Sequence, residues 1–361
     1  MTEQPGSTEP LVDQHDTVLL DLDGVVYRGA HAVPHAPEAI AALRQRGVGV
    51  MYVTNNASRP PATVSDHLTE LGIPTEPHEV TTAAQAAAGL VADEHPAGTR
   101  VLVVGGVGLR EALTEVGMTV VESADDDPAV VVQGFAPDVG WQQLSEALLA
   151  IDRGAEHIAS NLDATIPLER GIAIGNGSLV AALVNATGRH PRSTGKPQPA
   201  IFHQAAQRAG ARRPLVVGDR LDTDLEGARA AGYPGLHVLT GVDGPAELLR
   251  CAPARRPSLL ALDLRGLLVP HPPVRRDGDR WVCADAVAWV EGAPGEAVVV
   301  LRTGDGERRV QGEVVLDLDE LRAACAAAWA ASDEAGLPTT LADAGVDISV
   351  RTRPEDVGAI A

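Results

Sequence analysis

Apolar and polar residues follow two patterns along this chain, and together they predict an α/β fold. Short apolar runs, such as 18–20 and 48–53, are typical of buried strands. The stretch 37–46 carries apolar residues at the spacing of one helix face and ends at Gly47. A strand, a helix and a strand in this order predict a right-handed βαβ unit, whose two strand ends lie at one edge of a parallel sheet.

The same patterns predict the later elements, and a proline-rich break at 271–273 separates a last region that starts near 274. That region mixes strands near 281–282 and 297–301 with an Ala-rich helix over 318–335. The remaining expected elements are helices over 65–71, 108–116 and 141–153, and strands over 100–104, 130–133, 157–159, 214–217, 236–239 and 258–261.

Length and composition limit what this chain can do. Its 361 residues suggest two or three domains, and the 45% apolar and 22% charged residues are typical of globular proteins. It has no apolar run of the roughly 20 residues that span a bilayer. Residues 1–16 have neither the basic start nor the apolar core of a signal peptide. We therefore expect a disordered tail over 1–16 and a cytoplasmic protein.

Charge and cysteine content argue against several kinds of partner. The formal net charge of −20 opposes binding to nucleic acids and anionic membranes, since both would repel the protein. Cys251, Cys283 and Cys325 are odd in number, far apart and without Cys-x-x-Cys spacing. They predict reduced structural thiols, with neither a disulfide framework nor a zinc site.

Two carboxylates close the first strand. Asp21 and Asp23 stand two positions apart in the run 18–27 (VLLDLDGVVY), and Gly24 follows them. Period two places both acids on the same side while the chain is extended, and glycine permits a sharp turn there. Acids at the carboxyl end of a buried strand suit a hard cation and a phosphate, because open α/β sheets bind ligands outside these strand ends.

Three further polar clusters stand at expected strand ends or helix starts. Thr54 and Asn55 follow the second strand, and Asp219 and Asp224 follow a later one. Lys196 is the only lysine among 29 basic residues, which suggests a position where a compact ammonium does what a planar guanidinium cannot. Phosphoryl transfer needs an in-line nucleophile, neutralised equatorial oxygens and a proton donor for the leaving oxygen. The clusters offer a carboxylate nucleophile, carboxylate ligands for Mg²⁺, and a hydroxyl and an ammonium for the phosphoryl oxygens.

The segments DLDGVVY, TNNAS, GKP and GDRLDTD resemble, in this order, the four motifs of the haloacid dehalogenase superfamily of phosphatases. The resemblance implies a role for one or more residues of each motif. It implies Asp21 as nucleophile, Asp23 as general acid and base, Thr54 and Asn55 as phosphate-binding residues, Lys196 as phosphate clamp, Asp21, Asp219 and the carbonyl of Asp23 as Mg²⁺ ligands, and Asp224 just behind these ligands.

The spacing of the motifs places an inserted cap. Thr54 follows Asp21 by 33 residues, which one helix and one strand fill, whereas Lys196 follows Thr54 by 142. This layout resembles the 4-nitrophenylphosphatase-like branch, which includes phosphoglycolate, glycerol phosphate, nucleotide and pyridoxal phosphate phosphatases. We expect a Rossmann-like, doubly wound parallel-sheet core with an α/β cap between the second and third motifs, plus a small C-terminal α/β module. The expected parts are the tail 1–16, a core over 17–81 and 191–270, a cap over 82–190 and an extension over 274–361.

In such enzymes a cap loop sets the substrate, and the resemblance places it at 163–170 (DATIPLER). This loop has no aromatic side chain to stack on a nucleobase or a pyridoxal ring. A small polyol or acid phosphate is therefore favoured, with glycerol 3-phosphate first because PLE-x-G also resembles the phosphoglycolate and glycerol phosphate members. Phosphoglycolate, nucleotides and pyridoxal phosphate stay as alternatives. The residues expected to set specificity are Asp163, Thr165, Ile166, Glu169 and Arg170.

The chain repeats the first motif in another context. The run 314–319 (VVLDLD) matches it closely, but Glu320 replaces the glycine and no other motif follows. We interpret Asp317 as a helix N-cap, with Glu320 three residues later completing a capping box. The glycines of 105–108 (GGVG) lack the third glycine of a dinucleotide fingerprint and favour a turn that opens a helix.

Two other function classes compete with a phosphatase. A regulator that keeps the fold but turns over poorly would use the extension from 274 as its working part, yet every catalytic position is present. A two-component receiver domain also combines acids, a threonine and a lysine, but it has no second α/β block between them. The extension lacks the Arg/Gln-x-x-Gly-x-Gly loop typical of acyl-CoA binding. Its tryptophans would anchor a packed face or a subunit interface, which leaves a homo-oligomer open.

Overall fold

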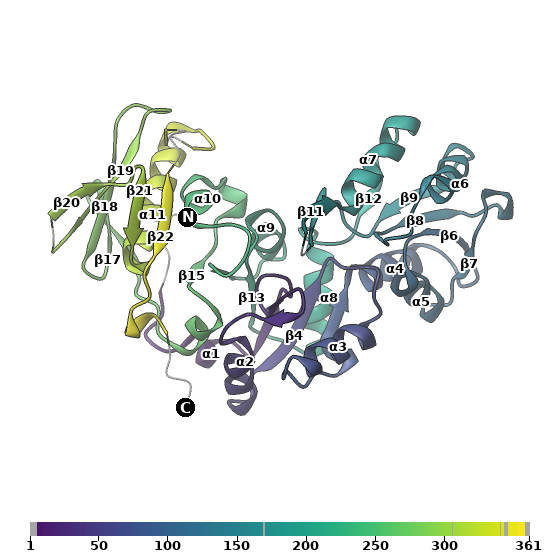
Figure 1. Cartoon of the computed structure of the whole chain (residues 1–361), viewed down its shortest axis with the longest axis horizontal. Helices are drawn as coiled ribbons and strands as arrows, with labels where there is room; N and C mark the ends of the chain where they lie inside the picture. The colour runs from purple at the N-terminus through teal and green to yellow at the C-terminus, as the bar shows by residue number, and fades with distance from the viewer. Residues whose placement is uncertain (1–5, 169, 305, 340, 343–345, 358–361) are drawn as a thin grey trace. The chain divides into compact units, whose positions relative to one another are not determined.

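The computed structural model describes residues 6–168, 170–304, 306–339, 341–342 and 346–357. The chain divides into two compact units, one formed by residues 1–50 with 211–361 and the other by residues 51–210. Both units contain a parallel sheet with helices between successive strands (Figure 1). The α/β fold expected from the sequence is therefore confirmed, while the expected division into core, cap and extension stays a prediction.

A six-stranded sheet carries the first and fourth motifs. Its strand order is β15-β14-β13-β1-β4-β5, so the chain begins in the middle, moves to one side and later returns to the other. This reversal lies between β1 and β13, which are parallel, with Thr17 paired to Pro214 and Leu20 to Val217. Doubly wound sheets bind ligands outside the carboxyl ends of strands at such a reversal. The strands are β1 (Thr17–Leu20), β4 (Gly49–Thr54), β5 (Val80–Thr82), β13 (Pro214–Gly218), β14 (Gly235–Val238) and β15 (Leu259–Ala261).

The helices of the first unit begin and end at residues with a clear physical role. Helix α2 (Ala36–Gln45) has a proline in its first turn, and Gly47, with φ of 75°, follows its end. The turn after β13 is a π-helical turn over Leu221–Leu225 that leads directly into α9 (Glu226–Ala230). The other short elements before residue 270 are β2 (Tyr27–Arg28), β3 (His31–Ala32), α10 (Pro245–Arg250) and the 3₁₀ turns Pro253–Arg255 and Leu264–Leu268.

The tail is a correction to the sequence-based expectation, which gave disorder over 1–16. Over the described part, 6–16, the chain is packed: helix α1 (Leu11–Gln14) contacts the 3₁₀ turn 264–268. The side chains of Leu11 and Val12 are only 1% and 4% exposed. The polar composition of the segment hid these two adjacent apolar residues, whose burial offsets the entropy of ordering a short polar stretch.

The second unit contains a parallel five-stranded sheet in the order β12-β9-β8-β6-β7. Helices α6 and α7 cover one of its faces, and α4 and α5 contact each other on the opposite face (Figure 1). Helix α4 begins at a capping box in which the Thr82 hydroxyl accepts the Gln85 N–H at 3.2 Å. The elements are α3 (Pro61–Glu70), α4 (Ala83–Glu94), β6 (Arg100–Val104), α5 (Val107–Glu115), β7 (Thr119–Val121), β8 (Val130–Gln133), α6 (Trp141–Asp152), β9 (Glu156–Ala159), β10 (Thr165–Leu168), β11 (Gly171–Ile174), α7 (Asn176–Thr187), β12 (Arg192–Ser193), α8 (Pro199–Ala209) and the 3₁₀ turns Pro77–Glu79 and Ala124–Asp126.

The region after residue 273 belongs to the first unit and packs against the preceding elements of that unit. A five-stranded antiparallel sheet, β16-β17-β18-β19-β20, packs against helix α11, which also contacts α10 and β15. One hydrophobic cluster contains Leu225, Leu248 and Leu260 of the preceding elements together with Leu321 and Trp329 of α11. The elements are β16 (Val274–Asp277), β17 (Arg280–Cys283), β18 (Ala286–Glu291), β19 (Val298–Thr303), β20 (Gly306–Arg309), β21 (Glu313–Leu316), α11 (Leu318–Ala335), β22 (Asp347–Val350) and the 3₁₀ turn Pro354–Asp356.

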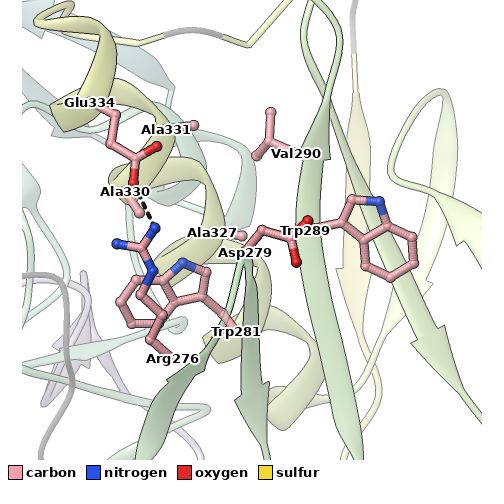
Figure 2. Close-up of a pocket in the computed structure, with 9 residues that line it drawn as sticks. All are labelled: Arg276, Asp279, Trp281, Trp289, Val290, Ala327, Ala330, Ala331 and Glu334. Atoms are coloured by element: carbon pink, nitrogen blue, oxygen red, sulfur yellow. Dashed lines mark hydrogen bonds and ion pairs between the residues drawn. The ribbon is translucent and has the colours of Figure 1, made fainter.

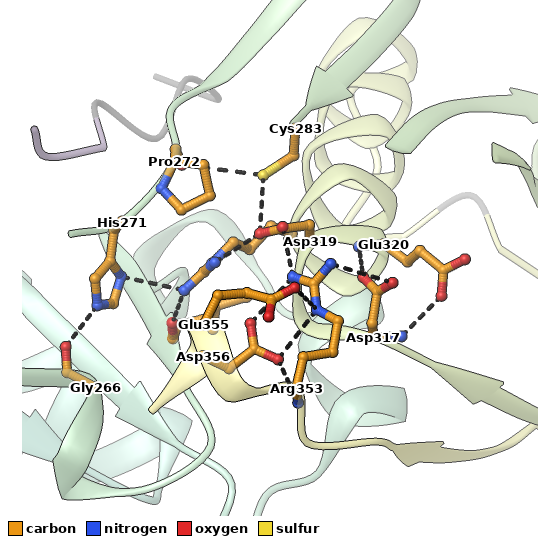
Figure 3. A network of polar contacts seen from close by, with 12 residues as sticks. Gly266, His271, Pro272, Cys283, Asp317, Asp319, Glu320, Arg353, Glu355 and Asp356 are labelled. Atoms are coloured by element: carbon orange, nitrogen blue, oxygen red, sulfur yellow. Dashed lines mark hydrogen bonds and ion pairs between the residues drawn. The ribbon is translucent and has the colours of Figure 1, made fainter. Parts of the chain in front are cut away.

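A buried polar network fastens α11 to the edge strand β15 (Figure 3). The Arg322 guanidinium donates to the Leu260 carbonyl at 2.8 Å and to Asp319 at 2.7 Å. It also lies 3.3 Å from Nδ1 of His271, whose Nε2 lies 2.8 Å from the Gly266 carbonyl. Since guanidinium only donates, His271 is neutral with its proton on Nε2. Burial first, and Arg322 second, lower the pKa of His271 to about 4.

The second DLD sequence and the three cysteines can also be compared with the expectations from the sequence. The Asp317 carboxylate accepts the Glu320 N–H at 2.9 Å, and Glu320 accepts the Asp317 N–H at 2.7 Å, so the predicted capping box is confirmed. Cys251, Cys283 and Cys325 are free and buried. Within the part of the chain that the structure describes, no helix combines the length and hydropathy needed to cross a membrane.

Candidate active site

The first motif forms a tight turn at the end of β1. The Asp21 N–H donates to the Val217 carbonyl at 2.9 Å, which extends the β1–β13 ladder by one bond. Asp21 is buried and Asp23 exposed, and Gly24, with φ of 91°, reverses the chain between them and the next residues. The Thr240 hydroxyl donates to the Gly24 carbonyl at 2.7 Å and so holds the turn from the loop after β14.

Asp219 and Asp224 lie beside Asp21. One carboxylate oxygen from each of these three residues lies within 4.8 Å of the other two. Asp219 is fully buried, and its Oδ2 accepts the N–H of Val242 at 2.7 Å. The Asp224 carboxylate accepts the Arg220 N–H at 3.2 Å. The structure therefore brings Asp224, expected from the sequence behind the metal ligands, into one cluster with Asp21 and Asp219.

Glycines make room for the Asp219 carboxylate. A Cβ added to Gly24 would lie 2.4 Å from Asp219 Oδ2, and one added to Gly241 would lie 1.7 Å from the same atom. Neither distance is compatible with a real side chain, so both positions require the absence of Cβ. At a third position, a Cβ added to Gly218 would lie 2.1 Å from the Cβ of Asp224.

The donor set of this cluster fits a hard divalent cation. Carboxylate oxygens are the ligands that Mg²⁺ prefers, and three acids so close together repel one another unless a cation or protons offset their charge. The position of the cluster, where the sheet order reverses between β1 and β13, is also where such sheets bind ligands. We conclude that Asp21, Asp219 and Asp224 are chemically able to hold Mg²⁺.

One residue of this region was missed by the sequence analysis. Asp243 accepts the Leu221 N–H at 2.6 Å and donates its own N–H to the Asp219 carbonyl at 3.1 Å, so it joins the two loops. Burial raises the pKa of Asp243, and the hydrogen bond from Leu221 opposes this rise. The signal was available, because Asp243 follows β14, a parallel strand next to β13, and therefore stands at the same sheet edge.

The second motif lies in the other compact unit, at the end of β4. Thr54 is the last residue of β4, and its hydroxyl accepts the Asn56 N–H at 3.1 Å. The Asn56 side chain in turn accepts the N–H groups of Ser58 at 2.8 Å and Arg59 at 3.3 Å. These bonds form local turns that give the loop a fixed course after the strand.

Lys196 is brought to this loop from far along the sequence. It is 4% exposed, and its N–H donates to Asn55 Oδ1 at 2.7 Å. Asn55 Nδ2 lies 3.2 Å from the Lys196 carbonyl and 3.0 Å from Asp163 Oδ2. The structure thus joins the second motif, the third motif and the first residue of the expected cap loop within the unit 51–210.

The rest of the expected cap loop forms a two-stranded hairpin. Thr165 and Ile166 lie on β10, which pairs with β11 in antiparallel register, and Arg170 is exposed in the turn. Glu169 lies outside the described residues. Two apolar side chains of β11, Ile172 and Ile174, are 81% and 63% exposed.

A separate cavity of about 160 Å³ lies in the C-terminal region (Figure 2). Trp281 and Trp289 line it together with an Arg276–Glu334 ion pair of 2.8 Å. It contains no residue of the four motifs, so it is distinct from the carboxylate cluster. The expectation that the tryptophans of the extension pack is borne out for Trp281 and Trp329, which are 3% and 2% exposed.

Comparison with known proteins agrees with this geometry. Residues 18–119 match the haloacid dehalogenase-like hydrolases, and residues 193–267 match the related HAD-hydrolase-like family. The chain is 42% identical over 322 residues to the D-glycerol 3-phosphate phosphatase of Mycobacterium tuberculosis, an alignment that covers 89% of this chain and 88% of the relative. The chain therefore belongs to the haloacid dehalogenase-like hydrolases, and the resemblance seen in the four motifs is confirmed.

Two solved structures extend the comparison. The glycerol phosphate phosphatase of Mycobacterium tuberculosis in complex with magnesium superposes with a TM-score of 0.77 at 37% identity and covers 96% of both chains. The 4-nitrophenylphosphatase of Thermotoga maritima gives a TM-score of 0.66 at 26% identity and covers 70% of this chain and 96% of its own. The first of these structures thus covers nearly the whole chain, whereas the second leaves 30% of it unmatched.

Proposed function

We propose that this protein is a Mg²⁺-dependent phosphatase that hydrolyses glycerol 3-phosphate through an aspartyl-phosphate intermediate. The observation that carries the proposal is the cluster of Asp21, Asp219 and Asp224 at the reversal point of the sheet. The choice of glycerol 3-phosphate as substrate is supported by the 42% identity to a D-glycerol 3-phosphate phosphatase over most of both chains. The magnesium bound in a related structure is consistent with the carboxylate donor set.

Two carboxylates of the first motif divide the chemistry between them. Asp21 attacks phosphorus, the bond to the glycerol oxygen breaks, and Asp23 gives its proton to that oxygen. Asp23 then takes a proton from a water molecule, which attacks the aspartyl-phosphate and restores Asp21 with release of phosphate. The exposure of Asp23 suits a group that must exchange protons with a leaving group and with water. Bound Mg²⁺ would shield the attacking carboxylate from the negative charge of the phosphate.

The residues of the second and third motifs hold the phosphoryl group in this proposal. Thr54 supplies a hydroxyl and Lys196 an ammonium for the phosphoryl oxygens, and Asn55 supplies its main-chain N–H. Asp21, Asp219 and the carbonyl of Asp23 would hold the cation, and Asp224 lies in the same carboxylate cluster. These assignments rest on the order of the four motifs and on family membership.

Substitution of the nucleophile tests the mechanism. Asp21→Asn removes the attacking carboxylate while keeping its size, so kcat for glycerol 3-phosphate should fall at least about 10³-fold. Asp317→Asn is the matched control, because it makes the same change in the second DLD sequence and keeps an N-cap side chain. Activity of Asp21→Asn close to that of the control would refute covalent catalysis by Asp21.

A substrate panel tests the specificity. We expect the highest kcat/KM for glycerol 3-phosphate among this ester, phosphoglycolate, a nucleoside monophosphate and pyridoxal phosphate. A clear preference for either ring-bearing substrate would replace the proposed substrate but leave the proposed chemistry intact. The cytoplasmic location, the homo-oligomer and the absence of nucleic acid or membrane partners stay predictions from composition and charge.

A further inference from the structure

Asn55 was expected to contact phosphate, yet its side chain is engaged by the protein. Its Oδ1 accepts the Lys196 N–H at 2.7 Å, and its Nδ2 donates to the Lys196 carbonyl at 3.2 Å. The amide thus pairs with both main-chain groups of the same residue, much as a neighbouring strand would. Two-point pairing of this kind fixes the position and the rotation of the Lys196 backbone, from which its side chain starts.

Asp163 determines which way this amide faces. Its two carboxylate oxygens lie 3.0 and 3.2 Å from Asn55 Nδ2. This NH₂ group can only donate hydrogen bonds. An ionised carboxylate only accepts, so the NH₂ end of Asn55 must face Asp163, and the carbonyl end must face the Lys196 N–H. A flipped amide would place an oxygen against a carboxylate and a donor against a donor.

The surroundings of Asp163 hold it in place. Its N–H donates to Asn161 Oδ1 at 3.2 Å, and its carbonyl accepts the Gly177 N–H at the start of α7 at 2.8 Å. Asn161 Nδ2 donates to the Asn55 carbonyl at 2.8 Å, which ties the same segment to the second motif. A Cβ added to Gly195 would lie 2.6 Å from Asn55 Oδ1, so the third motif needs a glycine for this close approach.

We propose that Asn55 and Asp163 are positioning residues that together set the Lys196 main chain and so aim its ammonium. The proposal goes beyond the function proposed above and rests on it for the role of Lys196 as phosphate clamp. Asp163 also begins the segment expected to meet the leaving group. The pair therefore links the loop that recognises the leaving group to the residue that holds the phosphoryl group.

A charge-swap experiment tests the pair. Asn55→Asp places two carboxylates about 3 Å apart and removes the donor to Lys196, so we expect kcat/KM to fall at least about 100-fold. Asp163→Asn keeps an acceptor for Asn55 but loses the charge, and we expect a loss of about 5- to 10-fold. In the double variant, the amide introduced at position 163 can donate to the carboxylate introduced at position 55. The kcat/KM of the double variant should therefore recover at least about tenfold from the value of Asn55→Asp.

The readout must separate positioning from mere stability. Orthovanadate binds phosphoryl-transfer sites as a transition-state analogue and has no leaving group. Its inhibition constant should therefore rise for Asn55→Asp and recover in the double variant, with melting temperature recorded in parallel. Asp127→Asn is the matched control, since Asp127 lies in the same unit in an exposed ion pair with Arg100 of 3.3 Å. It should leave every value unchanged.

Three results would overturn the proposal. The first is a double variant no better than Asn55→Asp, because the pair would then not be coupled. The second is an unchanged vanadate constant in all variants, and the third is a loss that follows melting temperature alone. Rates with 4-nitrophenyl phosphate keep the test independent of the physiological substrate. Phosphate binding by calorimetry still reports on Lys196 if the wild-type protein proves to hydrolyse no ester, which would refute the proposed function instead.

Discussion

Helix α11 contributes to the hydrophobic core of the first unit, and the variant Trp329→Ala tests how much this packing stabilises the protein. The indole is 2% exposed, and its Nε1 donates to the Leu248 carbonyl at the end of α10 at 2.8 Å. The guanidinium of Arg256, which precedes β15, lies 5.6 Å from the centroid of the Trp329 ring. Truncation would therefore remove a large apolar contact and leave the Leu248 carbonyl without its donor.

The size of the effect follows from burial. A buried aromatic side chain removes about 150–250 Å² from water, which at about 25 cal/mol per Å² corresponds to about 4–6 kcal/mol. Measured truncations of buried aromatic residues cost about 3–5 kcal/mol, and an orphaned buried carbonyl adds about 1 kcal/mol or more. We expect Trp329→Ala to lower the free energy of unfolding by about 5 kcal/mol. Trp329→Phe keeps most of the apolar contact and should cost about 1–2 kcal/mol.

Urea unfolding followed by circular dichroism measures both values. Leu221 and Leu225, which follow Asp219, belong to the same cluster as Trp329, so loss of activity on heating should shift with the unfolding transition. A decrease of less than about 1 kcal/mol for Trp329→Ala would show that α11 is an independent appendage. The same result would predict that a protein ending at residue 270 is stable, whereas the shared cluster predicts that it is not.

Three other predictions concern separate features. Gly241→Ala would force the Asp219 carboxylate to move, since a Cβ would lie 1.7 Å from its Oδ2. The Mg²⁺ affinity measured by calorimetry should therefore fall at least about tenfold. The control Gly244→Ala, whose Cβ meets only the Glu247 side chain at 3.3 Å, should bind Mg²⁺ normally. Asp317→Ala should lower the unfolding free energy by about 1 kcal/mol in urea, and a Ser replacement should restore most of it; equal values would contradict the N-cap role. Burial holds the folded-state pKa of His271 at about 4, below its unfolded value near 6.5. The neutral His271 therefore contributes fully to the free energy of unfolding above pH 6.5, and this contribution is lost as the pH falls toward 4. Stability at pH 5 should therefore drop by about 2 kcal/mol through this residue, and His271→Gln should reduce the pH dependence by that amount.

The second DLD sequence shows how far local context can be read. Its apolar run matches the first motif, but Glu320 in place of glycine points to a helix start, and the structure contains that helix. Asp319 is 6% exposed and lies 2.7 Å from Arg322 and 2.6 Å from Arg353. Burial alone would raise the pKa of Asp319, but its hydrogen bonds to these two arginines hold it below its usual range. The Asp319 carboxylate therefore serves to hold Arg322 and Arg353 in the folded protein.

The sequence alone determined most strands of the two parallel sheets, the turn glycines and the four motifs, because these depend on local period and on backbone conformations that few residues adopt. It did not predict the hairpin β10–β11, which was expected as a loop, or most strands after residue 273. It also placed polar residues at strand ends, since parallel strands share an edge. Only the tertiary structure decided which of these residues touch. Asn55 contacts residues 108 and 141 positions away, and no local pattern marks such a bond. The burial of Leu11 and Val12 and the core shared with α11 were hidden for the same reason, since burial depends on surfaces that distant segments provide.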